Sequence, residues 1–418
     1  MPRVRMRTAA RRRAPAAANR VPSAGPNGVI LRAICFWWAC RVSGTVPASN
    51  CCRCDDSERT GPGMEADAQV TLARKDEHLE PFRRGGVPAR QATTWLECVG
   101  LVHQALPELN HDDIDTTCAI AGKQLAAPVF ITGMTGGSRQ AGTINRSLAR
   151  VADELGLAFG LGSGRAMLEH PQAVASYQVR DCAPRVFLAW NLGGCQLLHT
   201  PLDTIKRALD RLAADAICIH LNPAQELAQP EGDRDFRGIL PAIEKLVAGL
   251  ERPVIVKECG CGIGREVGRQ LAGAGVEWLD VSGCGGTSWV GVEVQRQGER
   301  AGAELQALWD WGIPTAAAVA EQRGNGLQVI ASGGIRTGLD VARALVLGAR
   351  LAGVAAPVLQ AYFRDGEDGC RDYLAGLVAG LRRVMLLCGC ADLERLHRAP
   401  RVLAEPLAGW LRQRLAGS

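Results

Sequence analysis

The chain has 418 residues, carries 48 Lys+Arg against 43 Asp+Glu for a formal net charge of +5, and is 47% hydrophobic but only 5% aromatic. These fractions exclude a disordered, collagen-like or coiled-coil chain, and the length suits one large α/β barrel or two ordinary domains. The chain contains no run of about 18 apolar residues, so no transmembrane helix is predicted. Most of the 16 Cys stand inside apolar runs, which indicates a reducing, cytoplasmic compartment rather than a disulfide scaffold.

The first 63 residues differ from the rest of the chain in charge. They contain 11 Arg and 3 acidic residues, a net charge of +8, whereas the remaining residues carry a net charge of −3. They show neither helical nor strand periodicity. A basic arm for nucleic acid, a targeting peptide and a disordered tail are three interpretations of this segment. We favour a fourth, in which the protein starts at Met64. The chain is therefore divided into a disordered or spurious extension over 1–63 and a barrel domain over 64–418.

Eight short apolar runs follow from residue 128, separated by longer amphipathic stretches. The runs are Pro128–Thr132, Leu157–Ser163, Val186–Leu192, Ala216–Leu221, Pro253–Glu258, Trp278–Gly283, Gln328–Gly334 and Leu351–Pro357. Several are continuously apolar, which is typical of parallel strands covered on both faces. The stretches between them, among them Leu202–Ala214 and Leu339–Gly348, have the apolar spacing of amphipathic helices. Eight βα units in succession predict an α/β fold of the (β/α)8 TIM-barrel type, with helices from about Asp368 to Leu396 on its outside.

Polar and glycine-rich segments stand at the ends of seven of these strands. In a barrel, the loops after the strands build the functional site, so we expect these segments to meet at one face. Glycine lets backbone N–H groups approach a ligand, and Ser, Thr and Asn supply neutral hydrogen bonds to a polar planar molecule. The last two strand ends, Gly333–Arg336 and Gly353–Ala356, have the form of a phosphate site. The N-terminus of a helix beginning near Leu339 is expected to complete it.

An ordered set of motifs extends from residue 74 to residue 287. It consists of Arg74-Lys75-Asp76-Glu77-His78, Met134-Thr135-Gly136-Gly137, Gly162-Ser163-Gly164-Arg165, His220-Leu221-Asn222-Pro223-Ala224-Gln225-Glu226, Lys257-Glu258-Cys259-Gly260-Cys261-Gly262 and Ser282-Gly283-Cys284-Gly285-Gly286-Thr287. No single motif is decisive, but the set in this order closely resembles the type 2 isopentenyl-diphosphate isomerases over about residues 70–360. These are FMN-dependent barrels that interconvert isopentenyl diphosphate and dimethylallyl diphosphate.

The resemblance implies a set of contacts to FMN. The residues are Thr132, Gly133, Met134, Thr135, Ser163, Asn191, Lys257, Ser282 and Thr287, and those at the phosphate are Gly333, Gly334, Ile335, Ala355 and Ala356. Lys257 ends a buried strand, where an unpaired ammonium is costly, and a flavin that becomes anionic at its pyrimidine edge is a suitable partner. The other interpretation of Lys257 is a structural ion pair with Glu258.

The resemblance also implies how the substrate is held. Its substrate-binding residues are Arg74, Lys75, Ser163, Gly164, Arg165 and Gln225, of which the three basic side chains hold the diphosphate. Mg²⁺ bound to Glu226 neutralises the remaining charge, as expected for a cation that combines few carboxylates with phosphate oxygens. His220 and Gln225 are the side-chain candidates for a catalytic role. The family commonly has a longer polar residue where this chain has Gly164, so a side-chain contact to the substrate is lost there.

The implied reaction is redox-neutral, because it adds a proton to one alkene carbon and removes one from its neighbour. No strong acid stands among the matched side chains, so reduced FMN is expected to act as the acid and base. NADPH is then needed only to reduce the flavin beforehand. We expect a homo-oligomer, with Ser288–Gly312 as a lid or subunit contact, and neither a nucleic-acid partner nor membrane association.

Two other functions remain open from the sequence. An FMN oxidoreductase of the 2-hydroxy-acid oxidase or dihydroorotate dehydrogenase type shares the barrel and the phosphate site. The former normally carries a His-Gly-x-Arg-like segment near strand seven, whereas Gln322–Gly326 contains no His. The second alternative is a non-catalytic protein that binds flavin, or nucleic acid through the basic arm.

Overall fold

The computed structural model describes residues 79–415. Its centre is a closed barrel of parallel strands in the order β10-β11-β4-β5-β6-β7-β8-β9, completed by the pairing of β9 with β10. The strands are β4 Val129–Ile131, β5 Ala158–Ser163, β6 Phe187–Gly193, β7 Ala216–Leu221, β8 Val254–Glu258, β9 Trp278–Asp280, β10 Gln328–Ala331 and β11 Leu351–Val354. Each overlaps one of the eight apolar runs, so the predicted (β/α)8 barrel is confirmed. The predicted boundary after residue 63 lies outside the described residues.

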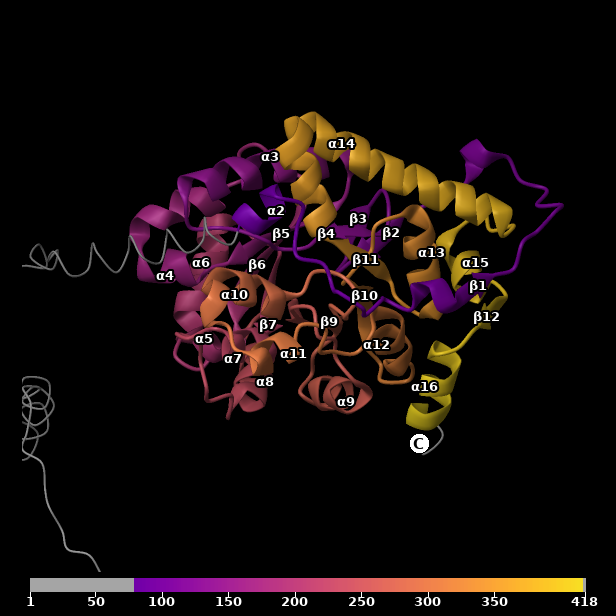
Figure 1. Cartoon of the computed structure of the whole chain (residues 1–418). Coiled ribbons are helices and arrows are strands. Elements are labelled where there is room, and N and C mark those ends of the chain that lie inside the picture. The colour runs from indigo at the N-terminus through magenta and orange to yellow at the C-terminus, as the bar shows by residue number, and fades with distance from the viewer. Residues whose placement is uncertain (1–78, 416–418) are drawn as a thin grey trace, which may run out of the picture. The chain divides into compact units, whose positions relative to one another are not determined.

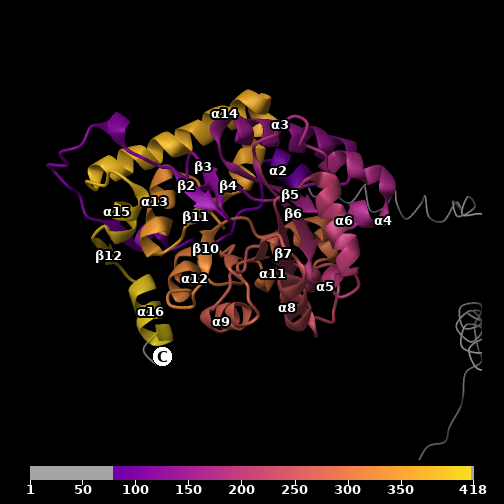
Figure 2. The same ribbon diagram turned by 180° about the vertical axis from the view of Figure 1, so that it is seen from behind.

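Helices surround the barrel (Figure 1), as the view from behind also shows (Figure 2). They are α2 Glu80–Arg83, α3 Arg139–Leu155, α4 Arg165–Glu169, α5 Gly194–Leu197, α6 Leu202–Leu212, α7 Pro223–Ala228, α8 Ile239–Gly249, α9 Arg265–Gly273, α10 Trp289–Gln297, α11 Ala303–Ala307, α12 Thr315–Glu321, α13 Gly338–Leu347, α14 Ala356–Leu387, α15 Leu393–Arg398 and α16 Leu407–Leu415. The helices predicted over 202–214 and 339–348 are α6 and α13. The helix α13 ends at Gly348, whose φ of 121° stops further helical turns.

The long helix α14 covers the outside of the barrel, as predicted, but starts earlier than expected. It begins at Ala356, directly after β11, and is bent at Asp365 and Gly366, whose backbone angles are not helical. It packs against α3 and α13 (Figure 1) through buried side chains that include Leu374 and Leu381. No helix within residues 79–415 is long and apolar enough to cross a membrane.

The barrel strands are apolar on both faces because each face packs against a different layer. Inward-pointing residues at the start of the strands, such as Phe130, Phe187 and Ile255, form one buried cluster. The hairpin β2 (Cys118–Ile120) and β3 (Lys123–Leu125) adds Ile120 and Leu125 to this cluster. The hairpin therefore closes the N-terminal mouth of the barrel and leaves the C-terminal mouth for a site. A second small sheet pairs β1 (Val99–Leu101) with β12 (Arg401–Leu403).

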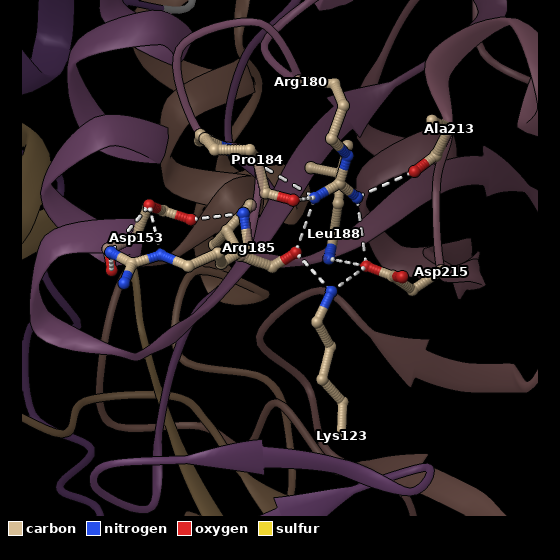
Figure 3. Close-up of polar contacts among 10 residues, drawn as sticks. Lys123, Asp153, Arg180, Pro184, Arg185, Leu188, Ala213 and Asp215 are labelled. Atoms are coloured by element: carbon tan, nitrogen blue, oxygen red, sulfur yellow. Dashed lines mark hydrogen bonds and ion pairs between the residues drawn. The ribbon is translucent and has the colours of Figure 1, made fainter.

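A polar cluster around Asp215 fastens this hairpin to the barrel (Figure 3). The Oδ2 atom of Asp215, just before β7, accepts hydrogen bonds from the backbone N–H of Leu188 at 2.7 Å and from Lys123 Nζ at 3.1 Å. Arg180 donates to the same oxygen at 3.1 Å and to the carbonyl of Ala213 at 2.7 Å. One carboxylate thus connects β3, β6 and β7 at the end of the barrel opposite the C-terminal mouth.

We expect Asp215→Ala to lower the free energy of unfolding by about 1–3 kcal/mol, because it leaves a backbone N–H and two cations without their shared acceptor. Denaturant unfolding of the two proteins measures this change. Asp235→Ala is the control, because Asp235 pairs with Arg237 on the exposed surface and such pairs contribute little. Ligand binding at the C-terminal mouth should be the same in all three proteins. Equal stability of Asp215→Ala and the wild type would contradict this account.

Candidate functional site

A single cavity at the C-terminal ends of the strands gathers nearly all of the predicted site residues that the structure describes. Those that line it are Thr132, Gly133, Met134, Thr135, Ser163, Arg165, Asn191, His220, Gln225, Glu226, Lys257, Ser282, Thr287, Gly333, Gly334, Ile335, Ala355 and Ala356. Arg74 and Lys75 lie outside the described residues. The cavity therefore has contributions from the ends of all eight barrel strands.

Gly164 does not line the cavity, although both of its neighbours do. A Cβ atom at this position would lie 2.2 Å from Nε1 of Trp190, a fully buried side chain of β6. The backbone N–H of Gly164 donates to the carbonyl of Asn191 at 2.7 Å, which fixes the turn. The indole thus fills the space that a longer side chain would need. In this chain, a side chain at position 164 would therefore meet Trp190.

The floor of the cavity holds a buried charged group. Lys257, at the end of β8, is 8% exposed, and its Nζ donates to the backbone carbonyl of Glu258. Burial lowers the pKa of Lys257, but its negative neighbours, Asp280 among them, outweigh this and raise the pKa overall, so the ammonium is charged. Asp280 is fully buried beside it in β9, and its Oδ1 accepts a hydrogen bond from Ser332 Oγ at 2.5 Å.

Burial raises the pKa of Asp280, and the charge of Lys257 opposes that shift. The carboxylate of Glu258 is turned to its own loop, where it accepts backbone N–H groups. The ammonium of Lys257 therefore donates a hydrogen bond to the backbone carbonyl of Glu258 and is stabilised by the negative charge of Asp280. A side-chain ion pair with Glu258 does not account for its position. The sequence motif drew attention to Lys257 but not to Asp280.

A second polar group lies where α7 meets the cavity. The carboxylate of Glu226 accepts a hydrogen bond from Asn222 Nδ2 at 2.9 Å through Oε1 and from the backbone N–H of Asp233 at 2.9 Å through Oε2. These two contacts orient the carboxylate. No group of three or more His, Cys, Asp and Glu within residues 79–415 forms a ready-made metal site. A cation on Glu226 would need further oxygens from a ligand and from water.

Arg165 brings positive charge to the same end of the cavity. It opens α4 directly after β5, and its Nε donates to Glu169 Oε1 at 2.7 Å. Burial lowers the pKa of its guanidinium, but the carboxylate of Glu169 raises it, with smaller contributions from Asp233 and Glu226. An Arg held between carboxylates stays charged and is suited to bind a phosphate group beside a cation.

The other end of the cavity forms an anion cradle. Gly333 and Gly334, just after β10, have φ of 97° and 78°, and a Cβ on Gly333 would lie 2.1 Å from the carbonyl of Gly283. Glycine is therefore required for this turn. The helix α14 begins at the cavity, and Ala355 before it provides no side-chain cap. Pro357 has no N–H and the N–H of Val358 donates to the carbonyl of Ala355, so the N–H of Ala356 is the one in this first turn that is left for an anion.

The helix near Leu339 does not have this role. The first turn of α13 is closed by its own capping box, in which Thr337 and Asp340 satisfy each other's backbone N–H groups. The expectation that this helix supplies the anion site is therefore corrected, because α14, one βα unit later, presents the uncapped N-terminus. The predicted residues Ala355 and Ala356 belong to that N-terminus.

An apolar wall that the sequence did not predict completes the cavity. This wall consists of Leu79 just before α2, Phe82 in α2, Trp289 at the start of α10, and Leu359. The ring centroids of Phe82 and Trp289 are 6.0 Å apart, in a tilted arrangement. Trp289 stands two residues after the predicted Thr287, and this closeness in sequence could have indicated that it lines the cavity. Phe82 comes from a segment before the barrel, where no sequence pattern indicated a place in the site.

The segment Ser288–Gly312 is held in place as part of this wall. The indole N–H of Trp309 donates to the carbonyl of Pro88 at 3.0 Å, and Asp310 accepts backbone N–H groups from Arg90, Gln91 and Ala92. These contacts fix the segment to the chain that precedes the barrel. Polar lining residues that the sequence analysis did not assign are Gln196, Gln229 and Ser332.

The polar groups of the cavity fit a flavin nucleotide. Oγ1 of Thr135 and Oδ1 of Asn191 are buried at the cavity and have no hydrogen-bond partner in the described part of the chain. Buried polar atoms are normally paired, so these two mark contacts for a ligand. The charged Lys257 suits the pyrimidine edge of a flavin, and the cradle at α14 suits a phosphate.

Comparison with known proteins gives three kinds of likeness. The family model of FMN-dependent dehydrogenases matches residues 228–403. The isopentenyl-diphosphate delta-isomerase of Pyrococcus furiosus is 42% identical over 355 residues, which cover 82% of this chain and 90% of the relative. The isopentenyl-diphosphate delta-isomerase of Halobacterium salinarum is also 42% identical over 355 residues, covering 83% and 98%. The crystal structure of mandelate oxidase has a TM-score of 0.55 at 22% identity and covers 82% of this chain and 98% of that chain, which shows a shared fold.

Proposed function

The chain belongs to the family of type 2 isopentenyl-diphosphate delta-isomerases, and from this premise we propose that its cavity interconverts isopentenyl diphosphate and dimethylallyl diphosphate with bound FMN. One observation supports the proposal most strongly. A single cavity combines an anion cradle at one end, a buried cation on its floor, Glu226 and Arg165 at the other end, and an apolar wall beside them. This arrangement suits a flavin and a prenyl diphosphate together.

The residues of the cavity divide into three roles in this proposal. Lys257 and the neutral side chains Thr135 and Asn191 orient the flavin ring. Gly333, Gly334 and the first turn of α14 bind its phosphate. When bound in its reduced form, FMN supplies both an acid and a base at one centre, which is what a double-bond shift without net electron transfer needs. NADPH is proposed only as the donor that first reduces the flavin.

The substrate is proposed to lie between the flavin and α7. Arg165 binds the diphosphate, together with Arg74 and Lys75 from the preceding segment, while Glu226 would hold a Mg²⁺ that neutralises the remaining charge of the diphosphate. The alkene chain then lies against Trp289 and the rest of the apolar wall, which exclude water. An aromatic face is also favourable beside a carbocation-like centre. His220 and Gln225 lie at this end of the cavity and are the side-chain candidates for moving a proton.

The solved structure of mandelate oxidase supports the oxidoreductase alternative only as a shared fold. The segment Gln322–Gly326 was expected to occupy the position of an oxidase's catalytic base. The structure has it between α12 and β10, where the amide of Gln322 donates to the carbonyl of Ile263, and it does not line the cavity. The lack of His in that segment therefore does not distinguish an oxidase from an isomerase. The similarity to relatives named as isomerases favours the isomerase.

The purified protein should show a flavin absorption spectrum and should convert isopentenyl diphosphate to dimethylallyl diphosphate under anaerobic conditions with reduced FMN and Mg²⁺. Product formation is measured by chromatography of the dephosphorylated alcohols. The same protein with oxidised FMN serves as the control and should be inactive. Oxygen consumption with 2-hydroxy acids, without isomerisation, would support the oxidoreductase and overturn the proposal.

Three further expectations remain proposals: the start at Met64, a homo-oligomer and a cytoplasmic location. A chain that begins at Met64 should fold and match the activity of the full chain, since residues 1–63 lie outside the family resemblance. Loss of activity in the shortened chain with excess FMN would contradict this.

A homo-oligomer is supported by exposed apolar side chains on the segment Ser288–Gly312, above all by Trp311, which is 64% exposed. Light scattering tests it. Cytoplasmic location stays an expectation from the cysteine content.

A further inference from the structure

Glu258 is a buried carboxylate that the proposed chemistry does not use. It ends β8, is 6% exposed and does not line the cavity. Its Oε2 atom accepts hydrogen bonds from the backbone N–H groups of Cys259 and Cys261, each at 2.5 Å. The chain therefore folds into a turn around this carboxylate immediately after Lys257.

The turn that Glu258 organises is a wall of the cavity. Cys259 and Gly260 line the cavity, and Gly260 has a φ of 122° that favours glycine. The N–H groups of Gly260 and Gly262 both donate to the carbonyl of Ser282, at 3.0 Å each. Glu258 thus holds the turn, and the turn holds Ser282.

Ser282 needs such support because its backbone is strained. Its φ of 38° lies in the left-handed region, which side chains other than glycine rarely adopt. Asp280 Oδ1 accepts its N–H at 3.2 Å, and the turn after β8 donates to its carbonyl. Ser282 lines the cavity among the residues assigned to the flavin. Hydrogen bonds to an ionised carboxylate are stronger than those to a neutral group, so the charge of Glu258 tightens this support.

Few charges act on Glu258. The titratable groups that face it are Lys257, Cys259 and Cys261 on its own segment and Cys284 after β9. Burial raises the pKa of all three thiols, to about 11 for Cys259, so they are neutral near pH 7. Lys257 faces Asp280 as well and donates to the carbonyl of Glu258. Burial raises the pKa of the Glu258 carboxyl from 4.5 to about 7, and the N–H groups and Lys257 oppose the shift only in part.

We propose that Glu258 is a positioning residue: its ionised carboxylate holds the turn 259–262 and Ser282 against the flavin, so that loss of its charge weakens flavin binding. This inference rests on the proposed FMN site. It predicts two pH dependences, one of stability and one of flavin affinity, and only the second distinguishes this role from a purely structural one. Between about pH 4.5 and 7 the folded protein holds a proton at Glu258 that the unfolded chain releases. Protonation of this group therefore adds stability to the folded protein as the pH falls through that window. Flavin affinity moves in the opposite direction, since the protonated carboxyl holds the turn less tightly.

The test compares FMN dissociation constants of wild type and Glu258→Gln between pH 6 and 8.5, measured by flavin fluorescence. The phosphate of FMN also titrates near pH 6, so the readout is the ratio of the two constants at each pH. We expect Glu258→Gln to bind FMN about tenfold more weakly at pH 8.5, equivalent to ~1.4 kcal/mol, and the ratio to fall toward one at pH 6. Denaturant unfolding of the apoprotein should show that the variant is at least as stable as the wild type at pH 8.5.

Glu321→Gln is the matched control. Glu321 is fully buried and accepts the backbone N–H of Arg265 at the start of α9, but it lies outside the cavity. Its removal should lower stability and leave the ratio of FMN constants independent of pH. A pH-independent ratio for Glu258→Gln, or a stability loss that fully explains its weaker binding, would overturn the inference. Failure of the wild type to bind FMN would instead overturn the proposed function.

Discussion

Glu226→Gln is expected to lower kcat/KM for isopentenyl diphosphate by two to three orders of magnitude while FMN binds as tightly as before. The single amide oxygen of Gln can still accept the N–H of Asp233, and the side-chain amide of Asn222 can turn to accept from the new NH2 group, so the fold of α7 is kept. What is lost is the charge that binds Mg²⁺ beside the diphosphate. Metal-mediated neutralisation contributes several kcal/mol, and each ~1.36 kcal/mol is tenfold in rate.

The measurement is a steady-state assay at a series of Mg²⁺ concentrations, together with an FMN titration. Part of the loss in Glu226→Gln should be recovered at high Mg²⁺, because the diphosphate itself still binds the metal. Glu244→Gln, an exposed carboxylate on α8, is the control and should behave as the wild type. Normal turnover of Glu226→Gln at low Mg²⁺ would show that the metal is not bound at α7.

The barrel and most of its site were predictable because both depend on local patterns. Apolar runs such as Val129–Ile131 are buried on two faces, so they identify parallel strands. The closed barrel brings all strand ends to one mouth, so Lys257 and Gly333 meet in one cavity although they lie far apart in the sequence. The positions of the strands therefore predict that the polar residues after them share one mouth, whereas the roles of these residues toward FMN and the substrate are implied by the family resemblance.

The residues that the sequence did not reveal depend on contacts between distant segments. Phe82 and Trp289 form the apolar wall from two segments outside the regular βα pattern. The space beside Gly164 is filled by Trp190 of the next strand, which no local pattern indicates. The assignment of the anion site to α13 missed a signal that was present, since Thr337 and Asp340 have the spacing of a helix cap.

Removal of the charge at Lys257 is expected to have the largest effect on the cofactor. Lys257→Met keeps the length of the side chain but leaves the fully buried Asp280 without its cation. Leaving a buried charge uncompensated in this way costs about 3–5 kcal/mol, so the free energy of unfolding should fall at pH 8. The loss should shrink as the pH falls, because burial raises the pKa of Asp280 and a protonated carboxyl no longer needs the cation.

The double variant Lys257→Met/Asp280→Asn separates stability from flavin binding. The neutral amide that replaces the Asp280 carboxylate can still accept the hydrogen bonds from Ser332 and from the N–H of Ser282, so the double variant should recover most of the lost stability in denaturant unfolding. It should not recover affinity for reduced FMN in an anaerobic fluorescence titration, because the cation beside the anionic ring edge is still absent. The ratio of reduced to oxidised FMN affinity should therefore fall in both variants. If the double variant binds reduced FMN as tightly as the wild type, Lys257 serves Asp280 alone and the flavin does not lie against the floor of the cavity.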